Sequence, residues 1–362
     1  MAPTAVERAA VGVVRDKGSE GRVTVRQVLV LSTNAYLGDV LCARPLLGAV
    51  KKRFQQAHVT LLAPPASYPF DPRSVSPEID EWLPFAYRSA NPGAVLRLGR
   101  ELRARRFEVA IVPSTFSTSR TLHVLSYLSR APVRAGIRRK NGVRNLAAFL
   151  LTVTGEFDWT RRHQIDRHLD VGGLVGCRLS ASELAAVRLP VGEAEDREAE
   201  LLLSGGSGTR ARTVVGIHAG ARDGRQVWPP ENFAVLARKL REAHRCDVLL
   251  TCGPMDGPVV ALIRGRLAAL GVEHRVAPPV SAAVLAAVVR RLGLYVTLDT
   301  GAMHVGHFAG ARMVAIARTS QVDAWCYRGQ REATVHASRV ADIPVDEVFS
   351  ACDRMLRSCV RP

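Results

Sequence analysis

The chain has 362 residues, 47% of them hydrophobic, and a formal net charge of +17 carried mainly by arginine. This length suits two domains with full cores, and no apolar run reaches the ~20 residues that a membrane-spanning helix needs. The seven cysteines are scattered without a C-x-x-C pair, which argues against a structural zinc site or a disulfide framework and favours free thiols.

Residues 1–24 have few bulky apolar side chains and carry scattered charges, without the apolar core of a signal peptide. We expect a flexible N-terminal tail here. We therefore expect a cytoplasmic protein, which can also lie peripherally on the inner face of the cell membrane.

Residues 25–195 are expected to form a first Rossmann-like domain, in which short apolar runs alternate with longer helical patterns. The predicted strands are 27–32, 58–62 and 108–112. The predicted helices are 39–54, 94–106 and 119–128. This β-α-β order predicts a parallel sheet covered by helices.

A polar and then glycine-rich stretch, 196–212, is predicted to link this domain to a second Rossmann-like domain, 213–345. The predicted strands of the second domain are 213–218, 247–251, 292–298 and 313–317. Its predicted helices are 231–243, 258–270, 282–292 and 302–309. Residues 346–362 are expected to form a C-terminal helix that can return to pack on the first domain. The fold class is therefore α/β with two doubly wound domains, whose ligands bind at the carboxyl ends of the strands.

The most informative segment is Leu298–His304 (LDTGAMH), between a predicted strand and a predicted helix. Gly301 lets a ligand approach the backbone closely, and the N–H groups at a helix N-terminus suit a phosphate. Thr300 adds a hydroxyl donor, and His304 lies one helical turn further on. The alternative is an ordinary helix start with Asp299 or Thr300 as the N-cap.

The segment Ser32–Asp39 (STNAYLGD) also follows a predicted strand and precedes a predicted helix. Gly38 permits a tight turn, and Asp39 lies in the first helical turn, where the helix dipole favours an ionised carboxylate. A carboxylate at a strand end that faces an interdomain cleft is a candidate general base. Asp in a first turn also commonly serves only to stabilise its helix, and both interpretations stay open.

Two further strand-end loops carry candidate donor ligands. In His218–Phe233 (HAGARDGRQVWPPENF), Arg222 and Arg225 can reach phosphate oxygens. In the loop CGPMD that follows Thr251, Asp256 can accept hydrogen bonds from ribose hydroxyls or can serve as a turn residue.

Basic residues are concentrated in two segments of the first half. They are Arg97, Arg100, Arg103, Arg105 and Arg106, and then Arg130, Arg134, Arg138, Arg139, Lys140 and Arg144. Little aromatic interleaving and no helix-turn-helix or zinc-finger spacing argue against a nucleic-acid partner. An anionic acceptor, anionic lipid headgroups and a merely solvated face stay open as explanations.

Several of these motifs occur together in a fixed order. They are LGD at 37–39, HAGA at 218–221, WPPENF at 228–233, CGPMD at 252–256 and LDTGAMH at 298–304. In this combination residues 25–320 resemble glycosyltransferase family 9, the ADP-heptose heptosyltransferases of lipopolysaccharide assembly. The last motif contains the family's D-T-G-x-x-H signature in full, and HQIDR at 163–167 is similar to a further family motif.

The resemblance implies a GT-B fold, with two Rossmann-like domains and the active site in the cleft between them. It implies an inverting glycosyltransferase that needs no metal or other cofactor, with ADP-heptose as co-substrate donor and an anionic lipopolysaccharide-core glycolipid as acceptor. Carried over by position, Asp39 would be the catalytic base. The donor-binding residues would be Asp299, Thr300, Gly301, His304, Gly220, Arg222, Arg225, Gln226 and Asp256, with Met255 beside the last. Tyr36 beside the proposed base, and Arg138, Arg139 and Lys140 from the basic segments, would bind the anionic acceptor.

The sequence departs from the family pattern at three positions. Gln226 stands where members usually carry lysine, Ala219 where they carry proline, and Tyr36 where serine or threonine is common. Three alternatives therefore accompany the heptosyltransferase hypothesis. They are a transferase for a secondary-metabolite or protein acceptor, a catalytically weak nucleotide-sugar-binding subunit, and an epimerase or hydrolase of GT-B shape.

Overall fold

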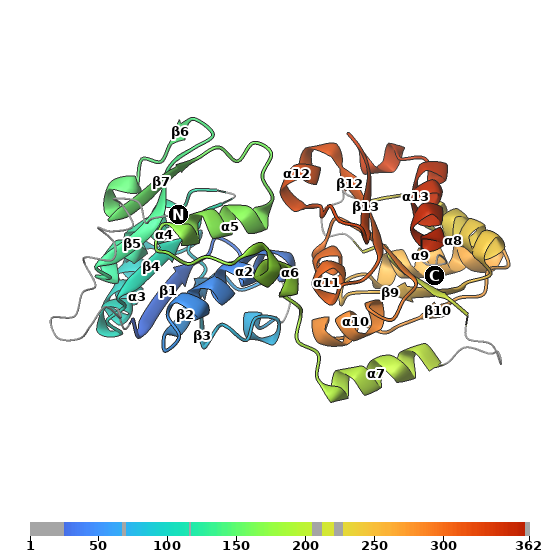
Figure 1. Cartoon of the computed structure of the whole chain (residues 1–362), viewed down its shortest axis with the longest axis horizontal. Helices are drawn as coiled ribbons and strands as arrows, with labels where there is room; N and C mark the ends of the chain where they lie inside the picture. Colours follow the sequence, from blue (N-terminus) through green and yellow to red (C-terminus); the bar gives the residue numbers. More distant parts are fainter. Residues whose placement is uncertain (1–24, 67–69, 116, 205–211, 221–226, 359–362) are drawn as a thin grey trace. The chain divides into compact units, whose positions relative to one another are not determined.

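The computed structural model describes residues 25–66, 70–115, 117–204, 212–220 and 227–358. The chain divides into two compact units, residues 1–187 and 188–362, and each unit has a sheet of its own (Figure 1). Nearly all strand pairs in both sheets are parallel, so the predicted α/β fold class is confirmed.

Within its described residues, the first unit forms a seven-stranded sheet in the order β3-β2-β1-β4-β5-β6, with β7 paired to β5. Its strands are β1 (Gln27–Leu31), β2 (His58–Ala63), β3 (Glu81–Pro84), β4 (Val109–Val112), β5 (Val133–Lys140), β6 (Val143–Arg144) and β7 (Val153–Phe157). Strands β2 and β4 flank β1 on opposite sides. Successive strands are therefore added in one direction from β1 to β3 and in the opposite direction from β4 onward. Ligands of doubly wound sheets bind at such a switch point.

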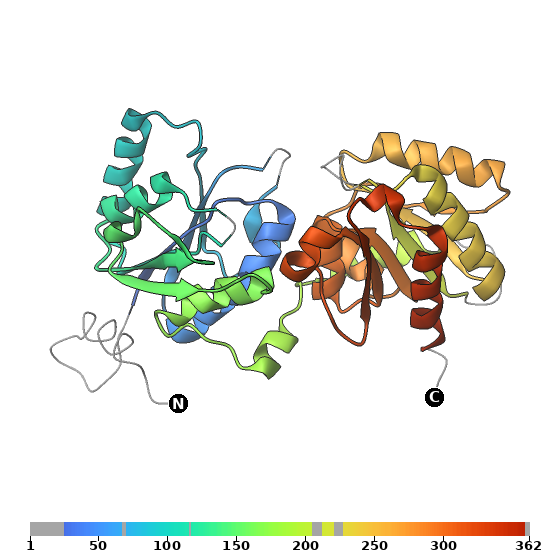
Figure 2. The same ribbon diagram turned by 90° about the horizontal axis from the view of Figure 1, so that it is seen from above.

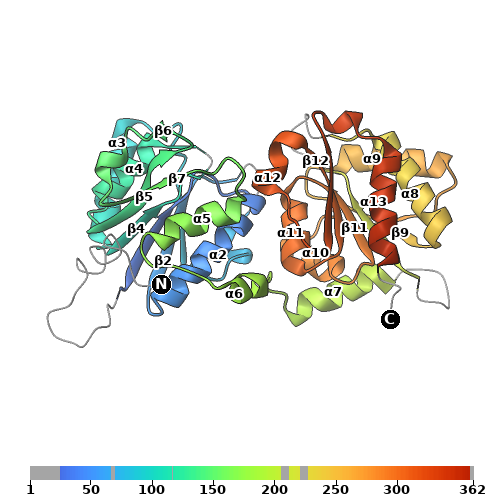
Figure 3. The ribbon, with the colours of Figure 1, turned by 45° about the horizontal axis from the view of Figure 1, so that its top comes forward.

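Helices cover both faces of this sheet. They are α2 (Leu37–Arg53), α3 (Pro92–Ala104), α4 (Arg120–Leu128), α5 (Gln164–Gly173) and α6 (Ala181–Ala186), with single turns η1 (Pro72–Ser74) and η2 (Ala148–Leu150). Local sequence sets their starts, since the Asn91 side chain accepts the Ala94 N–H at 2.8 Å and Ser119 accepts that of Leu122 at 3.3 Å. Helices α2 and α5 lie side by side (Figure 3).

The second unit contains a six-stranded, all-parallel sheet in the order β10-β9-β8-β11-β12-β13 among its described residues. Its strands are β8 (Val214–His218), β9 (Asp247–Thr251), β10 (Arg275–Val276), β11 (Leu294–Leu298), β12 (Met313–Arg318) and β13 (Glu332–Ala337). The order reverses between β8 and β11, which is the switch point of this unit.

The helices of the second unit follow the same alternation. They are α7 (Glu193–Ser204), α8 (Pro230–His244), α9 (Gly257–Ala269), α10 (Ala282–Val289), α11 (Gly301–Ala309), α12 (Val322–Trp325) and α13 (Val345–Arg357), with single turns η4 (Thr319–Gln321) and η5 (Val340–Asp342). Helices α8 and α9, in yellow and light orange, pack side by side (Figure 2). No helix in the described part of the chain is long and apolar enough to cross a membrane.

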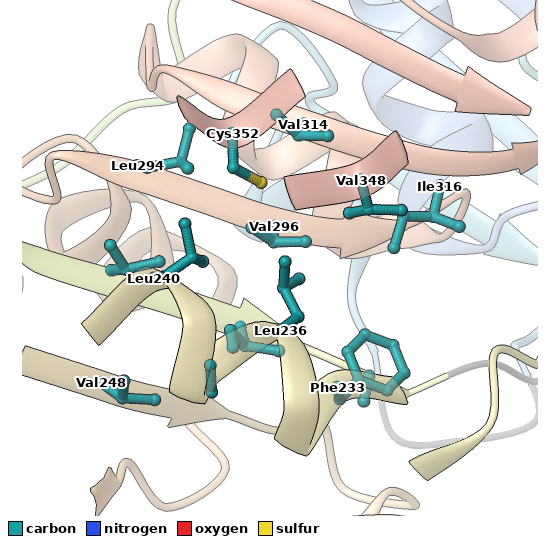
Figure 4. Close-up of a cluster of buried hydrophobic side chains, with 14 of the residues drawn as sticks. Phe233, Leu236, Leu240, Val248, Leu294, Val296, Val314, Ile316, Val348 and Cys352 are labelled. Carbon is teal, nitrogen blue, oxygen red and sulfur yellow. The ribbon is translucent and has the colours of Figure 1, made fainter. Parts of the chain in front are cut away.

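The C-terminal helix contributes to the core of the second unit. Helix α13 packs its apolar side chains on the sheet of that unit. Val348 and Cys352 lie in one buried cluster with Leu236 of α8, Val296 of β11 and Val314 of β12 (Figure 4). Apolar residues of α13 recur at helical spacing, which gives the helix one buried face.

The predicted linker at 196–212 also differs from the structure. The division between the units falls after Val187, and α7 occupies much of the predicted linker as part of the second unit. Ala199 is buried where α7 packs on α10, and the Arg275 guanidinium donates to the backbone carbonyl oxygens of Leu202 and Leu203. Residues 205–211 of the predicted linker lie outside the described residues.

Candidate functional site

Parallel pairing aligns three sequence motifs at the switch point of the second sheet. His218 at the end of β8 lies opposite Thr297 of β11 on one side and Thr251 of β9 on the other. The loops that follow these strands, with Gly220, Asp256 and Asp299, therefore leave the same edge of the sheet. Motifs separated by about 80 residues of sequence thus meet in one region.

The third of these loops leads directly into α11. Thr300 occupies the N-cap position in extended conformation, but its side chain makes no capping hydrogen bond. Its hydroxyl lies 3.5 Å from the carbonyl oxygen of Leu298, and Gly301 is the first helical residue. Side-chain capping by Thr300 is therefore excluded as the explanation of this motif. A helix start without a side-chain cap can offer backbone N–H groups to an anion.

Asp299 is a buried carboxyl group at this helix start. Asp299 is only 8% exposed, and this burial raises the pKa of its carboxyl group to about 6. The charge of Asp299 also contributes to the raised pKa of the nearby Cys326 thiol. A buried, easily protonated carboxyl group beside a helix N-terminus is typical of a functional site, because burial makes the ionised form unfavourable.

His304 is held by side chains that the sequence did not single out. Its Nδ1 lies 2.6 Å from the Tyr327 hydroxyl, and the imidazole meets the Trp325 ring edge to face. Tyr327 in turn stacks on His307 with ring centroids 3.5 Å apart, and His307 contacts the Glu332 carboxylate through Nδ1. The spacing of His304 and His307 on one helix was the available signal, but their partners lie on another loop and strand.

Asp256 faces the protein more than solvent. Its Oδ2 accepts the Gly253 N–H at 2.6 Å and lies 3.4 Å from Nε2 of His218. A Cβ atom at Gly220 would overlap the Asp256 carboxylate, so only glycine fits while that carboxylate keeps its position. Asp256, which was predicted to contact the ribose, therefore also joins the loop after β9 to the end of β8. The neighbouring Met255 is 66% exposed.

The His218 imidazole completes a buried polar chain. Its Nδ1 lies 3.1 Å from the Thr251 hydroxyl, which is 3.4 Å from the Tyr295 hydroxyl. Burial lowers the pKa of His218, although the Asp256 charge opposes that shift. A neutral imidazole fits both neighbours, since Nε2–H can donate to Asp256 while Nδ1 accepts from Thr251. Arg222, Arg225 and Gln226, which were predicted to bind the donor, lie outside the described residues.

In the first unit, Asp39 lies in the first turn of α2, just beyond β1 and hence at the switch point of that sheet. The Asn34 amide is 3.5 Å from Oδ1 of Asp39, and Arg88 donates to Asn34 Oδ1 at 3.4 Å. Tyr36 occupies the N-cap position without a side-chain capping bond. The location suits a general base and equally suits stabilisation of the start of α2.

A buried polar cluster lies beside the same switch point, at the carboxyl end of β4. The Gln164 amide donates to the Thr115 hydroxyl, and it lies 3.5 Å from Nε2 of His168. Burial lowers the pKa of His168 to about 3, so this imidazole is neutral. Gln164 is the first residue of α5 and His168 lies one turn further along, while His163 caps the helix by accepting the Ile165 N–H at 3.2 Å. The HQIDR motif thus has a structural role in starting α5.

The predicted acceptor residues Arg138, Arg139 and Lys140 lie at the end of strand β5. Arg138 and Arg139 are exposed and lie 3.1 and 3.6 Å from the Glu156 carboxylate of β7. Lys140 is partly buried, and burial followed by the charge of Arg167 lowers the pKa of its ammonium group. The three side chains are therefore not one uniform cationic patch.

Comparison with known proteins agrees with these motifs. Residues 95–339, well over half of the chain, match the family described as glycosyltransferase family 9 (heptosyltransferase). The chain belongs to glycosyltransferase family 9. A curated relative, lipopolysaccharide heptosyltransferase 2 of Salmonella typhimurium, is 26% identical over 221 residues, which are 59% of this family 9 chain and 60% of the relative. The chain thus matches less than two thirds of that relative's length.

Solved structures show the same fold. A family 9 glycosyltransferase from Veillonella parvula aligns with a TM-score of 0.72 and 20% identity, over 92% of this chain and 98% of that one. The ADP-heptose lipopolysaccharide heptosyltransferase II of E. coli aligns with a TM-score of 0.68 and 20% identity, over 92% and 100% of the two chains. Similarity over nearly the whole chain confirms the predicted GT-B fold for this family 9 protein.

The buried carboxyl group of Asp299 makes the stability of this family 9 chain depend on pH. Its folded-state pKa of about 6 lies above the ordinary value of 3.8, so the folded protein binds this proton more tightly than the unfolded chain. The protonated Asp299 carboxyl group therefore contributes to the free energy of unfolding below pH ~4, and this contribution is lost as the pH rises through about 6. We predict that Asp299→Asn raises the free energy of unfolding by about 3 kcal/mol at pH 8 and changes it little near pH 4.

Urea unfolding at the two pH values measures this difference. Asp342→Asn is a matched control, because the Asp342 side chain is 56% exposed, and it should stay within about 0.5 kcal/mol at both pH values. An equal gain from Asp299→Asn at both pH values would contradict the assignment.

The close contact of Gly220 with Asp256 predicts a coupled pair. Gly220→Ala should displace the Asp256 carboxylate from the Gly253 N–H and destabilise the second unit. In the double variant with Asp256→Ala the methyl group has room, so the two effects should fall short of additivity by about 0.5–3 kcal/mol. Unfolding free energies of the four proteins give this coupling.

Gly257→Ala is the control for the Gly220 pair, since a Cβ atom at Gly257 meets nothing within 4 Å. It should leave stability nearly unchanged. Strict additivity of Gly220→Ala and Asp256→Ala would show that the carboxylate does not occupy the space beside Gly220.

Proposed function

We propose that this chain is an inverting, metal-independent glycosyltransferase that transfers heptose from ADP-heptose to a hydroxyl of an anionic glycolipid of the lipopolysaccharide-core type. The observation that carries the proposal is the meeting of three strand-end loops at the start of α11, where Thr300 makes no side-chain cap. Family membership and the relatives' names support the choice of donor and acceptor.

The second unit is proposed to bind the donor. Backbone N–H groups at Thr300 and Gly301 would receive the diphosphate, because a helix start attracts anions without a metal ion. His304 would lie close to the same phosphates, held through Nδ1 by Tyr327. Arg222, Arg225 and Gln226 are proposed to approach the diphosphate from the loop after β8, and Asp256 to contact the ribose.

The first unit is proposed to bind the acceptor and to supply the base. The Asp39 carboxylate would take the proton of the acceptor hydroxyl as its oxygen bonds to the anomeric carbon. The bond from that carbon to the diphosphate breaks at the same time, and ADP leaves with the electron pair. Attack opposite to the leaving group inverts the anomeric centre. The negative charge on the diphosphate would be stabilised by the N–H groups of α11. Tyr36, Arg138, Arg139 and Lys140 are proposed to hold the acceptor, at the cytoplasmic face of the membrane.

Donor choice is tested by calorimetric binding of ADP, GDP, UDP and ADP-heptose to the full chain in the presence of a metal chelator. We expect ADP and ADP-heptose to bind, and we expect His304→Ala to weaken both by about tenfold through loss of a charge-assisted hydrogen bond. Preference for UDP or GDP would reject heptose from ADP-heptose as the transferred group. Absence of all binding would favour the inactive-subunit alternative.

The role of Asp39 predicts separate effects on binding and turnover. Asp39→Asn should lower kcat by about 10²–10⁴-fold, the usual contribution of a general base, and leave the Kd for ADP-heptose unchanged. ADP release in the presence of acceptor measures turnover. Asp71→Asn removes an exposed carboxylate that pairs with Arg73 in the same unit, and it should leave kcat unchanged. An equal loss of donor affinity in Asp39→Asn would reject its role as base.

A further inference from the structure

Three large apolar side chains are exposed within seven residues of the first unit. Val143, Leu146 and Phe149 are 72%, 69% and 81% exposed, and they lie between the ends of β5 and β7. We call these three residues the apolar tip. Exposed apolar side chains scattered singly need no explanation, whereas three within one short segment point to an interaction surface. The catalytic proposal for Asp39 makes no use of them.

The backbone of this segment is firmly held, so the exposure is not that of a loose loop. Strand β6 pairs with β5 around the turn Asn141-Gly142, whose φ angles of 48° and 78° suit a tight hairpin. The buried Asn145 side chain donates to the Ile137 carbonyl oxygen at 2.7 Å and accepts the Ala147 N–H at 3.0 Å. With Asn145 anchored inward, Leu146 next to it is held outward.

Basic residues flank the apolar tip in the sequence. Between residues 130 and 154 the sequence contains no Asp or Glu, and its cations are Arg130, Arg134, Arg138, Arg139, Lys140 and Arg144. Glu156 is the acidic partner of Arg138 and Arg139. Apolar side chains together with arginines match a membrane of anionic lipids, where the chains enter the interface and the cations meet the headgroups. A second copy of the same basic surface would be repelled.

The position of the tip in the sheet agrees with a lipid-borne acceptor. Strand β4 pairs with Val133–Gly136, and β5 continues beyond that pairing to Lys140, so the hairpin projects past the carboxyl end of β4. Figure 1 shows β6 at the upper margin of the first unit. Asp39 lies at the same edge of the sheet, two strands away, which is about 10 Å of sheet width.

We propose that the apolar tip, flanked by Arg144 and the arginines of β5, docks the first unit on an anionic lipid surface. The inference rests on the proposed glycolipid acceptor, because docking at this edge would bring a headgroup that emerges from the bilayer toward Asp39. Val143, Leu146 and Phe149 enter the interface, and no conformational change is needed because their side chains are already exposed.

Sedimentation with vesicles tests the proposal on the full chain. Vesicles of phosphatidylcholine with phosphatidylglycerol are compared with vesicles of phosphatidylcholine alone, at low and high salt. We expect binding to the anionic vesicles that weakens with salt. The variant V143S/L146S/F149S should bind them at least about tenfold less tightly, while its Kd for ADP stays unchanged.

The matched control is L201S/L262S, which removes two leucines of the second unit that are 75% and 60% exposed. It should bind vesicles as the unaltered chain does. Equal vesicle binding by V143S/L146S/F149S and the control would overturn the proposal, as would equal binding to both kinds of vesicle. Loss of self-association or of RNA retention in the tip variant, without loss of vesicle binding, would assign the tip to those partners and would also overturn it.

Transfer to a water-soluble acceptor that lacks acyl chains separates this proposal from the proposed function. If docking alone is wrong, the chain still binds ADP and transfers to that acceptor, but the tip variant sediments normally. If the proposed function is wrong, donor binding or transfer fails while vesicle binding still depends on the apolar tip.

Discussion

Parallel hydrogen bonding of β8 to β9 on one side and to β11 on the other is the constraint on which the donor region depends. The register places His218 between Thr251 and Thr297, so the loops after three strands leave one edge of the sheet together. Two of these loops also depend on each other, because Asp256 fills the space that Gly220 leaves open. A shift of one residue in the pairing with β9 would separate the buried His218 from Thr251, and a shift in the pairing with β11 would move the start of α11.

Strands with uninterrupted apolar runs were predicted within one or two residues, and 247–251 coincides with β9. Strand β5 was not predicted, because it ends in Arg138, Arg139 and Lys140 and so lacks a continuous apolar run. The dipeptide Asn141-Gly142 was nevertheless an available signal for a hairpin. Helix α7 was taken for a linker because its stability comes from contacts with α10 and Arg275, which composition does not reveal. In these cases tertiary packing outweighed the local pattern.

Contacts that form only in the folded chain also limited what could be predicted of the site. Single strand-end residues such as Asp39 and Asp299 were identifiable because their motifs lie at strand-helix junctions. Tyr327 and Glu332 were not, since nothing in their local sequence marks them and their relation to His304 and His307 exists only after β11, β12 and β13 align. Asp299 shows the converse case, in which a group predicted from sequence is found in an environment that destabilises its ionised form. Functional positions commonly carry such a local loss of stability.

Helix α13 has a consequence for the order in which the chain folds during synthesis. Its side chains complete the core beside β11, β12 and α8, so the second unit cannot close that core until Val345–Arg357 has left the ribosome. Between β8 and the end of α13 lie about 140 residues, which take on the order of ten seconds to synthesise. During that interval the apolar face of α8 has no complete partner, whereas the first unit already has all of its strands. The second unit is therefore the half of this protein that most needs protection from aggregation on the ribosome.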